Sequence, residues 1–187
     1  MFNENPTKRA LLITAVLLFY FGCSEAPIYH GKLGRRSSKK KISTTNNPNP
    51  YIAIKFSPPV NNYSAGRITS SFGVRNSPNY KYKERHTGID IDTTMGEPVV
   101  ASASGKVAFA GRRNGYGKII IVDHGKRIHT IYAHLSSILC KMGDYVKIGQ
   151  KIGKAGKSGR TTGTHLHFEI RVKGNAVNPI LYIDRTL

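Results

Sequence analysis

The distribution of apolar residues changes near Tyr51. Beyond it, β-branched and aromatic residues form short runs, and glycine, asparagine or aspartate separates most of them. No ten-residue window there shows a convincing helical period of 3.6 residues. Runs of this length between turn residues predict an antiparallel β-sheet domain, which we place at residues 61–187. The clearest runs are KVAFAG (106–111), KIIIVDHG (118–125), IHTIYAHL (128–135) and HLHFEIRV (165–172).

Residues that tolerate tight backbone geometry separate these runs. Asn114-Gly115 favours a turn, and the segments 123–125 (DHG) and 173–175 (KGN) favour hairpins. The strands on either side of the last two turns are therefore expected to pair with each other.

The amino terminus has the features of a secretion signal. Lys8 and Arg9 precede an apolar run over residues 10–21, and the small residue Gly22 follows. Twelve residues are too few for a stable membrane-spanning helix, which needs about 20. We therefore expect a signal peptide at residues 1–22.

Cys23 directly follows this segment, and Gly22-Cys23 resembles a bacterial lipobox, in which the cysteine carries lipid. Tyr20 and Phe21 are larger than the residues usual at those positions. Lipidation of Cys23 is therefore one alternative. Ordinary secretion or an uncleaved anchor is the other. Both place the protein in the cell envelope of a bacterium, either as a membrane-anchored lipoprotein or as a periplasmic or secreted protein.

Charge separates the next segment from the domain. The chain has 29 Lys and Arg against 10 Asp and Glu, a net charge of +19. Residues 26–83 contain eleven of the bases and no acid. The segment 35–50 has no apolar periodicity, so we expect a disordered basic tether at residues 23–60. The tether is either a solvated spacer or an adhesive segment for an anionic membrane or wall surface. A nucleic-acid partner is not expected behind a secretion signal, and two cysteines exclude a disulfide scaffold.

The motif HLHFEI contains the first candidate site residues. In a strand, His165, His167 and Glu169 share one face, and the intervening apolar residues face the core. The two imidazoles lie about 7 Å apart along such a strand and can meet a common metal or a water bound to it. Taken alone, the motif also fits two exposed strand histidines.

The motif HTGID contains the second set. His86 and Asp90 are four residues apart, and Gly88 between them permits a tight turn into a strand. One aspartate and two histidines form a ligand set that zinc accepts, with the fourth position left for water. Taken alone, this motif fits a turn with a capping aspartate.

The order HTGID, YAHL, HLHFE resembles the lysostaphin-like (LytM-type) zinc metallopeptidases of bacterial cell walls. The resemblance extends from about residue 66 to residue 183. It includes ITSSFGVR (68–75), RHTGIDI (85–91), GEPVVASASGKVAFAG (96–111), GYGKIIIVDHG (115–125), TIYAHL (130–135), the segment 143–171 and NPILYI (178–183).

The resemblance implies one zinc ion per chain, held by His86, Asp90 and His167. It also implies two catalytic histidines, His134 and His165, and leaves open which of them takes the proton. The metal lowers the pKa of a bound water to about 7, which makes hydroxide available. All five residues are present, whereas catalytically inactive relatives typically lack some of them. His124 and His129 are expected outside the site.

The function expected from this resemblance is hydrolysis of peptide crosslinks in peptidoglycan, either glycyl–glycyl bridges or D-Ala–diaminopimelate crosslinks. The alternative is a catalytically silent envelope regulator that binds murein or activates an amidase. A regulatory protein partner that unmasks the groove, or occlusion of the groove by an N-terminal segment such as 51–63, also stays open.

Overall fold

The computed structural model describes residues 54–77 and 82–183. The predicted signal peptide, Cys23 and most of the predicted tether lie outside these ranges. None of the helices in the described part of the chain is long and apolar enough to cross a membrane.

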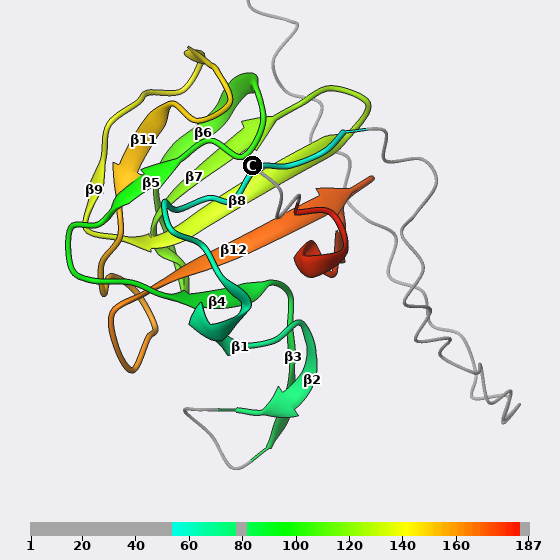
Figure 1. The fold of residues 1–187 in the computed structure, drawn as a ribbon, viewed down its shortest axis with the longest axis vertical. Helices are drawn as coiled ribbons and strands as arrows, with labels where there is room; N and C mark the ends of the chain where they lie inside the picture. The colour runs from blue at the N-terminus through cyan, green and yellow to red at the C-terminus, as the bar shows by residue number, and fades with distance from the viewer. Residues whose placement is uncertain (1–53, 78–81, 184–187) are drawn as a thin grey trace, which may run out of the picture. The chain divides into compact units, whose positions relative to one another are not determined.

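The described residues form a mainly antiparallel β fold (Figure 1), which confirms the predicted fold class. Two short 3-10 helices lie near the ends of the domain, η2 (Ala65–Arg67) and η3 (Pro179–Leu181). The strands are β1 (Ile68–Ser70), β2 (Gly73–Asn76), β3 (Lys83–His86), β4 (Ile89–Asp92), β5 (Pro98–Val100), β6 (Gly105–Arg113), β7 (Gly117–Asp123), β8 (Ile128–Leu135), β9 (Ser137–Ile138), β10 (Tyr145–Val146), β11 (Lys151–Lys154), β12 (His165–Val172) and β13 (Asn175–Val177).

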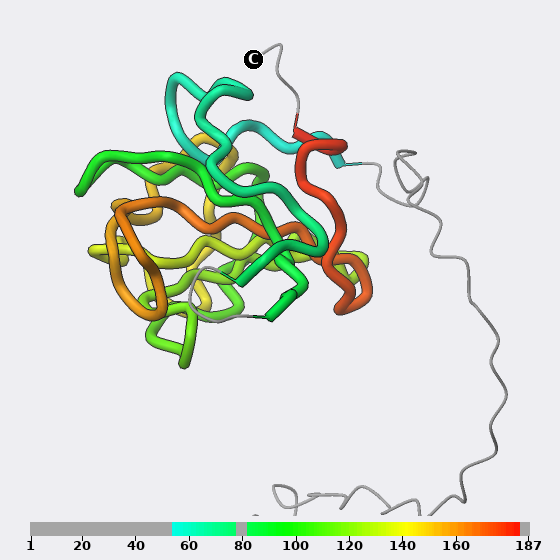
Figure 2. The backbone as a smooth tube through the Cα atoms, turned by 90° about the horizontal axis from the view of Figure 1, so that it is seen from below, coloured from blue at the N-terminus to red at the C-terminus, as the bar shows by residue number. Residues whose placement is uncertain are grey.

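The main sheet has the order β1-β4-β12-β8-β7-β6-β10, and β13 pairs with β12. A three-stranded sheet, β5-β11-β9, and the β2-β3 hairpin complete the fold. The late strand β12, orange in Figures 1 and 2, therefore lies between β4 and β8. This insertion brings the HLHFEI and HTGID motifs onto adjacent strands.

The predicted turns join strands that pair directly. Residues 124–127 connect β7 to β8, and residues 173 and 174 connect β12 to β13. The segment 114–116, expected only as a turn, also closes a hairpin, between β6 and β7. Gly115 has a φ of 78° there, a conformation that a residue with a side chain adopts only with strain.

Alternation along β12 separates the core from the site. Leu166, Phe168 and Ile170 are fully buried in the main hydrophobic core, as the sequence pattern predicts. Phe56 and Val60 are buried in the same core. The chain therefore already packs against the domain before residue 61, within the range expected for the tether.

Candidate metal centre and groove

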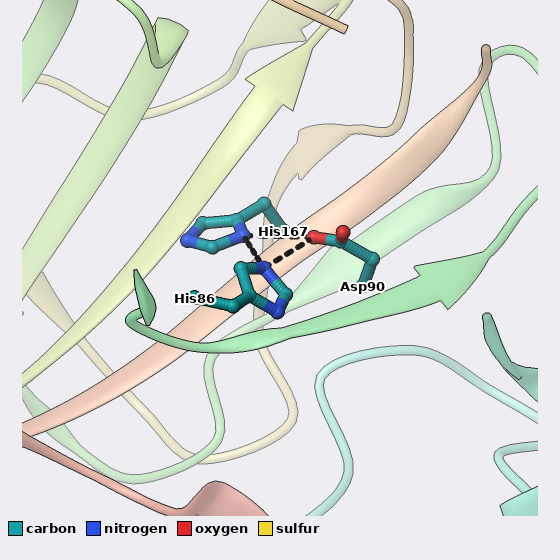
Figure 3. Close-up of side chains that lie close together, drawn as sticks. All are labelled: His86, Asp90 and His167. Atoms are coloured by element: carbon teal, nitrogen blue, oxygen red, sulfur yellow. Dashed lines mark hydrogen bonds and ion pairs between the residues drawn. The ribbon is translucent and has the colours of Figure 1, made fainter. Parts of the chain in front are cut away.

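His86, Asp90 and His167 converge on one point (Figure 3). His86 Nε2 lies 3.1 Å from Asp90 Oδ1 and 3.1 Å from His167 Nδ1, and the last two atoms are 2.8 Å apart. All three residues are buried. Two imidazole nitrogens and one carboxylate oxygen are donors that zinc takes in proteins, so the residues present fit that metal.

Strand pairing brings these side chains together. Asp90 of β4 and His167 of β12 are direct cross-strand partners, and paired residues of neighbouring strands project from the same face. His86 ends β3, and a short turn through Gly88 leads from it into β4. A Cβ at Gly88 would lie 2.3 Å from the carbonyl oxygen of Phe168. Glycine therefore allows β4 to approach the strand that carries His167.

The orientation of His86 is set by the backbone. Its Nδ1 lies 2.8 Å from the carbonyl oxygen of Ser71. A carbonyl oxygen only accepts, so Nδ1 carries the proton and Nε2 presents its lone pair to the cluster.

Asp90 is held as an anion with its two oxygens in different roles. Burial would raise its pKa, but the close imidazoles of His167 and His86 outweigh burial and hold the pKa far below the usual range. Oδ1 faces the two histidines, and Oδ2 accepts a hydrogen bond of 2.9 Å from Arg75 Nη1. Arg75 belongs to the SSFGVR segment and also contacts Glu84, at 3.1 Å. Arg75 thereby ties the β2-β3 hairpin to Asp90.

Glu169 is a site residue whose role the sequence left undefined. It is fully buried, and its Oε1 lies 3.0 Å from His167 Nε2. Burial would raise its pKa, but hydrogen bonds from His167, Arg171 and Thr87 lower it to about 2. A carboxylate on the far nitrogen of a metal-binding histidine fixes the ring and its tautomer. The face shared by His165, His167 and Glu169 was the only signal for this role in the sequence.

Replacing Glu169 with glutamine is expected to weaken zinc binding by about 10- to 100-fold, because the amide accepts more weakly from His167 than the carboxylate does. Competition with a chromophoric chelator measures this change. The matched control is Asp123→Asn, which makes the same carboxylate-to-amide change at a half-buried position away from the groove. Equal zinc affinity in Glu169→Gln and the wild type would remove Glu169 from this role.

β8 carries a bulge next to the site. Leu135 of β8 lies opposite Lys118 of β7, and Tyr132 lies opposite Ile120, so two residues of β8 face one residue of β7 there. The second of these two is His134, whose φ of 62° lies in the left-handed region. Bulges redirect side chains, and strained backbone of this kind is concentrated at functional sites.

The bulge changes the face on which His134 lies. In a regular strand it would share the face of Tyr132, which is fully buried in the core. Instead its ring centroid lies 4.8 Å from that of His165 and 5.8 Å from that of His167. Its Nδ1 donates to the carbonyl oxygen of Ser158 at 2.8 Å, which leaves Nε2 as an acceptor.

His165 presents an acceptor in the same way. The hydroxyl of Thr161 donates to the carbonyl oxygen of Gly163 at 2.7 Å, so it accepts from His165 Nδ1 at 3.1 Å. The remaining nitrogen, Nε2, lies 3.7 Å from Asp90 Oδ1, at the edge of the cluster.

Both of these histidines are neutral at neutral pH. Burial lowers the pKa of His134 to about 4, and the nearby His165 and His167 act in the same direction. Burial also lowers the pKa of His165. A neutral imidazole with a free nitrogen is competent to accept a proton.

An open groove of about 960 Å³ contains all five residues. Its other walls come from β1 to β3, from the β6-β7 turn and from residues 160–162. Residues 54–63 do not line it. His124 and His129 lie outside it, as expected: His124 bonds to Ser104 and Thr130 instead.

Three comparisons with known proteins agree with this geometry. Residues 84–179 match the model of Peptidase family M23. The chain is 45% identical over 114 residues to the DD-carboxypeptidase/endopeptidase Mpg of Neisseria meningitidis serogroup B, covering 61% of this chain and 26% of Mpg. It is 39% identical over 121 residues to the murein hydrolase activator NlpD of Escherichia coli, covering 64% of this chain and 30% of NlpD. The chain thus spans less than a third of either relative.

A solved structure with the same fold is that of a zinc-containing peptidase from Vibrio cholerae. The two chains are 37% identical, with a TM-score of 0.60 over 67% of this chain and 39% of the other.

Proposed function

Because the chain belongs to peptidase family M23, we propose that it is a zinc-dependent endopeptidase that hydrolyses peptide crosslinks of bacterial peptidoglycan. The observation that carries this proposal is that all five predicted site residues line one groove. His86, Asp90 and His167 could hold a metal ion, and His134 and His165, whose Nδ1 atoms are engaged elsewhere, line the same groove.

The roles of the residues follow from their hydrogen bonds. His86, Asp90 and His167 would hold the zinc ion, which when bound would supply Lewis-acid polarisation of the scissile carbonyl and lower the pKa of a water. His165 accepts the proton from the attacking water, because its Nε2 is unprotonated and borders the cluster. It then passes that proton to the leaving amine.

His134 orients the attacking water in this scheme. Its Nδ1 proton is committed to Ser158, so only an accepting nitrogen faces the groove. Stabilising an oxyanion would require a second proton on the ring, which its pKa of about 4 disfavours at neutral pH. A role as acceptor therefore fits the tautomer better than a role as donor.

The second candidate function is that of a catalytically silent envelope regulator. The similarity to NlpD, a murein hydrolase activator, favours it. The presence of all five site residues favours the enzyme. The deciding experiment incubates the full-length protein and zinc with intact murein sacculi and identifies released muropeptides by mass spectrometry. Loss of crosslinked muropeptides in favour of uncrosslinked ones, abolished by a chelator, supports the enzyme. Absence of any cleavage supports the regulator.

We also propose that a lipid on Cys23 anchors the protein in the envelope. The support is the Gly22-Cys23 pair at the end of a short apolar run. Cys23→Ser should then release the protein from the membrane fraction or block its processing, as seen by fractionation and mass. A mature protein that begins at Met1 would contradict the proposal.

Residues 23–60 are proposed to bind an anionic surface through their bases. Replacing the six Lys and Arg between residues 32 and 41 with glutamine keeps the length of the tether and removes its charge. At low salt, this variant should be retained less on anionic vesicles than the wild type. At high salt the difference should vanish, because the Debye length shrinks from about 10 Å at 0.1 M to about 3 Å at 1 M and screens the attraction. Turnover of a small soluble peptide should stay the same. A pure spacer would leave retention unchanged at every salt concentration.

A further inference from the structure

A second hollow adjoins the groove. Its volume is about 500 Å³, and it shares Asn114, Gly115 and Arg160 with the groove that contains the metal centre. Arg112 and Arg113, at the end of β6, complete its polar lining. The hollow therefore lies next to the groove, on the side of the β6-β7 turn and Arg160.

The hollow is strongly basic. Three arginines line it, and no aspartate or glutamate of the described residues does. Within residues 54–77 and 82–183, no carboxylate lies within ion-pair distance of Arg112 or Arg113. The Arg113 guanidinium lies 4.4 Å from the centre of the Phe109 ring. Arg160 Nη2 lies 4.0 Å from Glu84 Oε2.

Close backbone packing joins the two segments that carry the arginines. A Cβ at Gly117 would lie 2.3 Å from the carbonyl carbon of Ser158, and one at Gly159 would lie 2.3 Å from the nitrogen of Gly117. Both glycines also have positive φ. The backbone nitrogen of Arg160 donates to the carbonyl oxygen of Gly115 at 2.8 Å. The β6-β7 turn and the segment around residue 160 therefore form one rigid unit, and the basic hollow is built into the fold.

We propose that this hollow binds a carboxylate of the peptidoglycan stem peptide and so selects crosslinks that carry a free acid beside the scissile bond. The proposal rests on the proposed function, because it takes a peptide in the groove as the ligand. The guanidinium group of arginine can donate two parallel hydrogen bonds to the two oxygens of a carboxylate. Stem peptides carry free carboxylates on their acidic residues, whereas a glycyl bridge has none. The preference expected from charge-assisted bonds at an exposed site is about tenfold.

The test compares two soluble crosslinked muropeptides that differ only in whether these carboxylates are free or amidated. The full-length protein with zinc should show about tenfold higher kcat/KM for the free acid. The double variant Arg112→Gln/Arg113→Gln should lose this preference. Arg127→Gln, which removes one exposed arginine outside the hollow, should behave as the wild type. Equal rates on both forms in the wild type, or an unchanged preference in the double variant, would overturn the proposal.

A binding measurement separates this proposal from that of hydrolysis. Calorimetry with an uncrosslinked tetrapeptide in its free-acid and amidated forms reports on the hollow without any cleavage. Tighter binding of the free acid, lost in the double variant, would support the hollow even if no murein were cut. Cleavage of both muropeptides without discrimination would leave the peptidase proposal standing and sink the carboxylate site. A competition experiment adds inorganic phosphate or acetate at constant ionic strength. Release of the bound tetrapeptide by phosphate but not by acetate would show that the hollow prefers phosphate, and would also overturn the carboxylate proposal.

Discussion

Replacing His167 with alanine is expected to remove most of the zinc and all measurable hydrolysis. His167 supplies one of three donors, and its ring lies between Asp90, 2.8 Å from Nδ1, and Glu169, 3.0 Å from Nε2. Its loss removes a donor and also the partner of a buried carboxylate, so the remaining two ligands hold zinc weakly. Elemental analysis of the purified full-length variant measures the metal directly.

The control for this prediction is His129→Ala. His129 is half-buried on the same sheet, with its ring 3.8 Å from Asp123 and outside the groove. It should keep one zinc ion per chain and wild-type activity. Circular dichroism should show the same β-sheet signal in both variants, which separates loss of metal from loss of fold. A His167→Ala protein that keeps stoichiometric zinc would remove this residue from the ligand set.

Replacing His165 with alanine should lower turnover by about 10²- to 10⁴-fold while zinc stays bound, because general-base assistance contributes that much. His165 stands outside the three-donor set, with its free nitrogen 3.7 Å from Asp90 Oδ1. Turnover is measured as conversion of crosslinked muropeptides into uncrosslinked ones, and zinc by elemental analysis. Full activity in the variant would rule out His165 as the proton acceptor.

His134→Ala should show a similar loss, because the two rings lie 4.8 Å apart and act on the same water in the proposed scheme. The double variant should then lose less than the product of the two single losses, as residues that act as a unit do. His124→Ala, at a histidine bonded to Ser104 and Thr130 outside the groove, should stay close to the wild type. Multiplicative losses in the double variant would show that His134 and His165 act independently.

Local periodicity explains why much of the fold was predictable. Strand residues alternate between faces, so the pattern of HLHFEIRV alone separates Leu166, Phe168 and Ile170 from His165 and His167. The structure buries the first three completely. Turn residues likewise marked where β7 and β12 end, because tight turns require particular backbone conformations. These features depend on neighbours in the sequence, and the sequence therefore contains them.

The position of His134 depends on a contact between strands. Regular alternation from Tyr132 would send His134 into the core, and the bulge against β7 turns it into the groove with a φ of 62°. Nothing in the run IHTIYAHL marks the residue at which the bulge falls. The register between two strands decides it, and that register is set by packing across the whole sheet.

By itself, the sequence determined the fold class and the candidate metal-binding residues, through alternation, turn chemistry and the resemblance to a known family. Only the tertiary structure decided how distant segments meet. β12 pairs with β4 and so sets His167 against Asp90. Glu169 accepts hydrogen bonds from Thr87 and Tyr116, and two arginines at the end of β6 line one hollow with Arg160. The physical reason is the distance along the chain over which each effect acts. Side-chain periodicity depends on a few neighbouring residues. These contacts join residues that are far apart in the chain and come together only when the sheet forms.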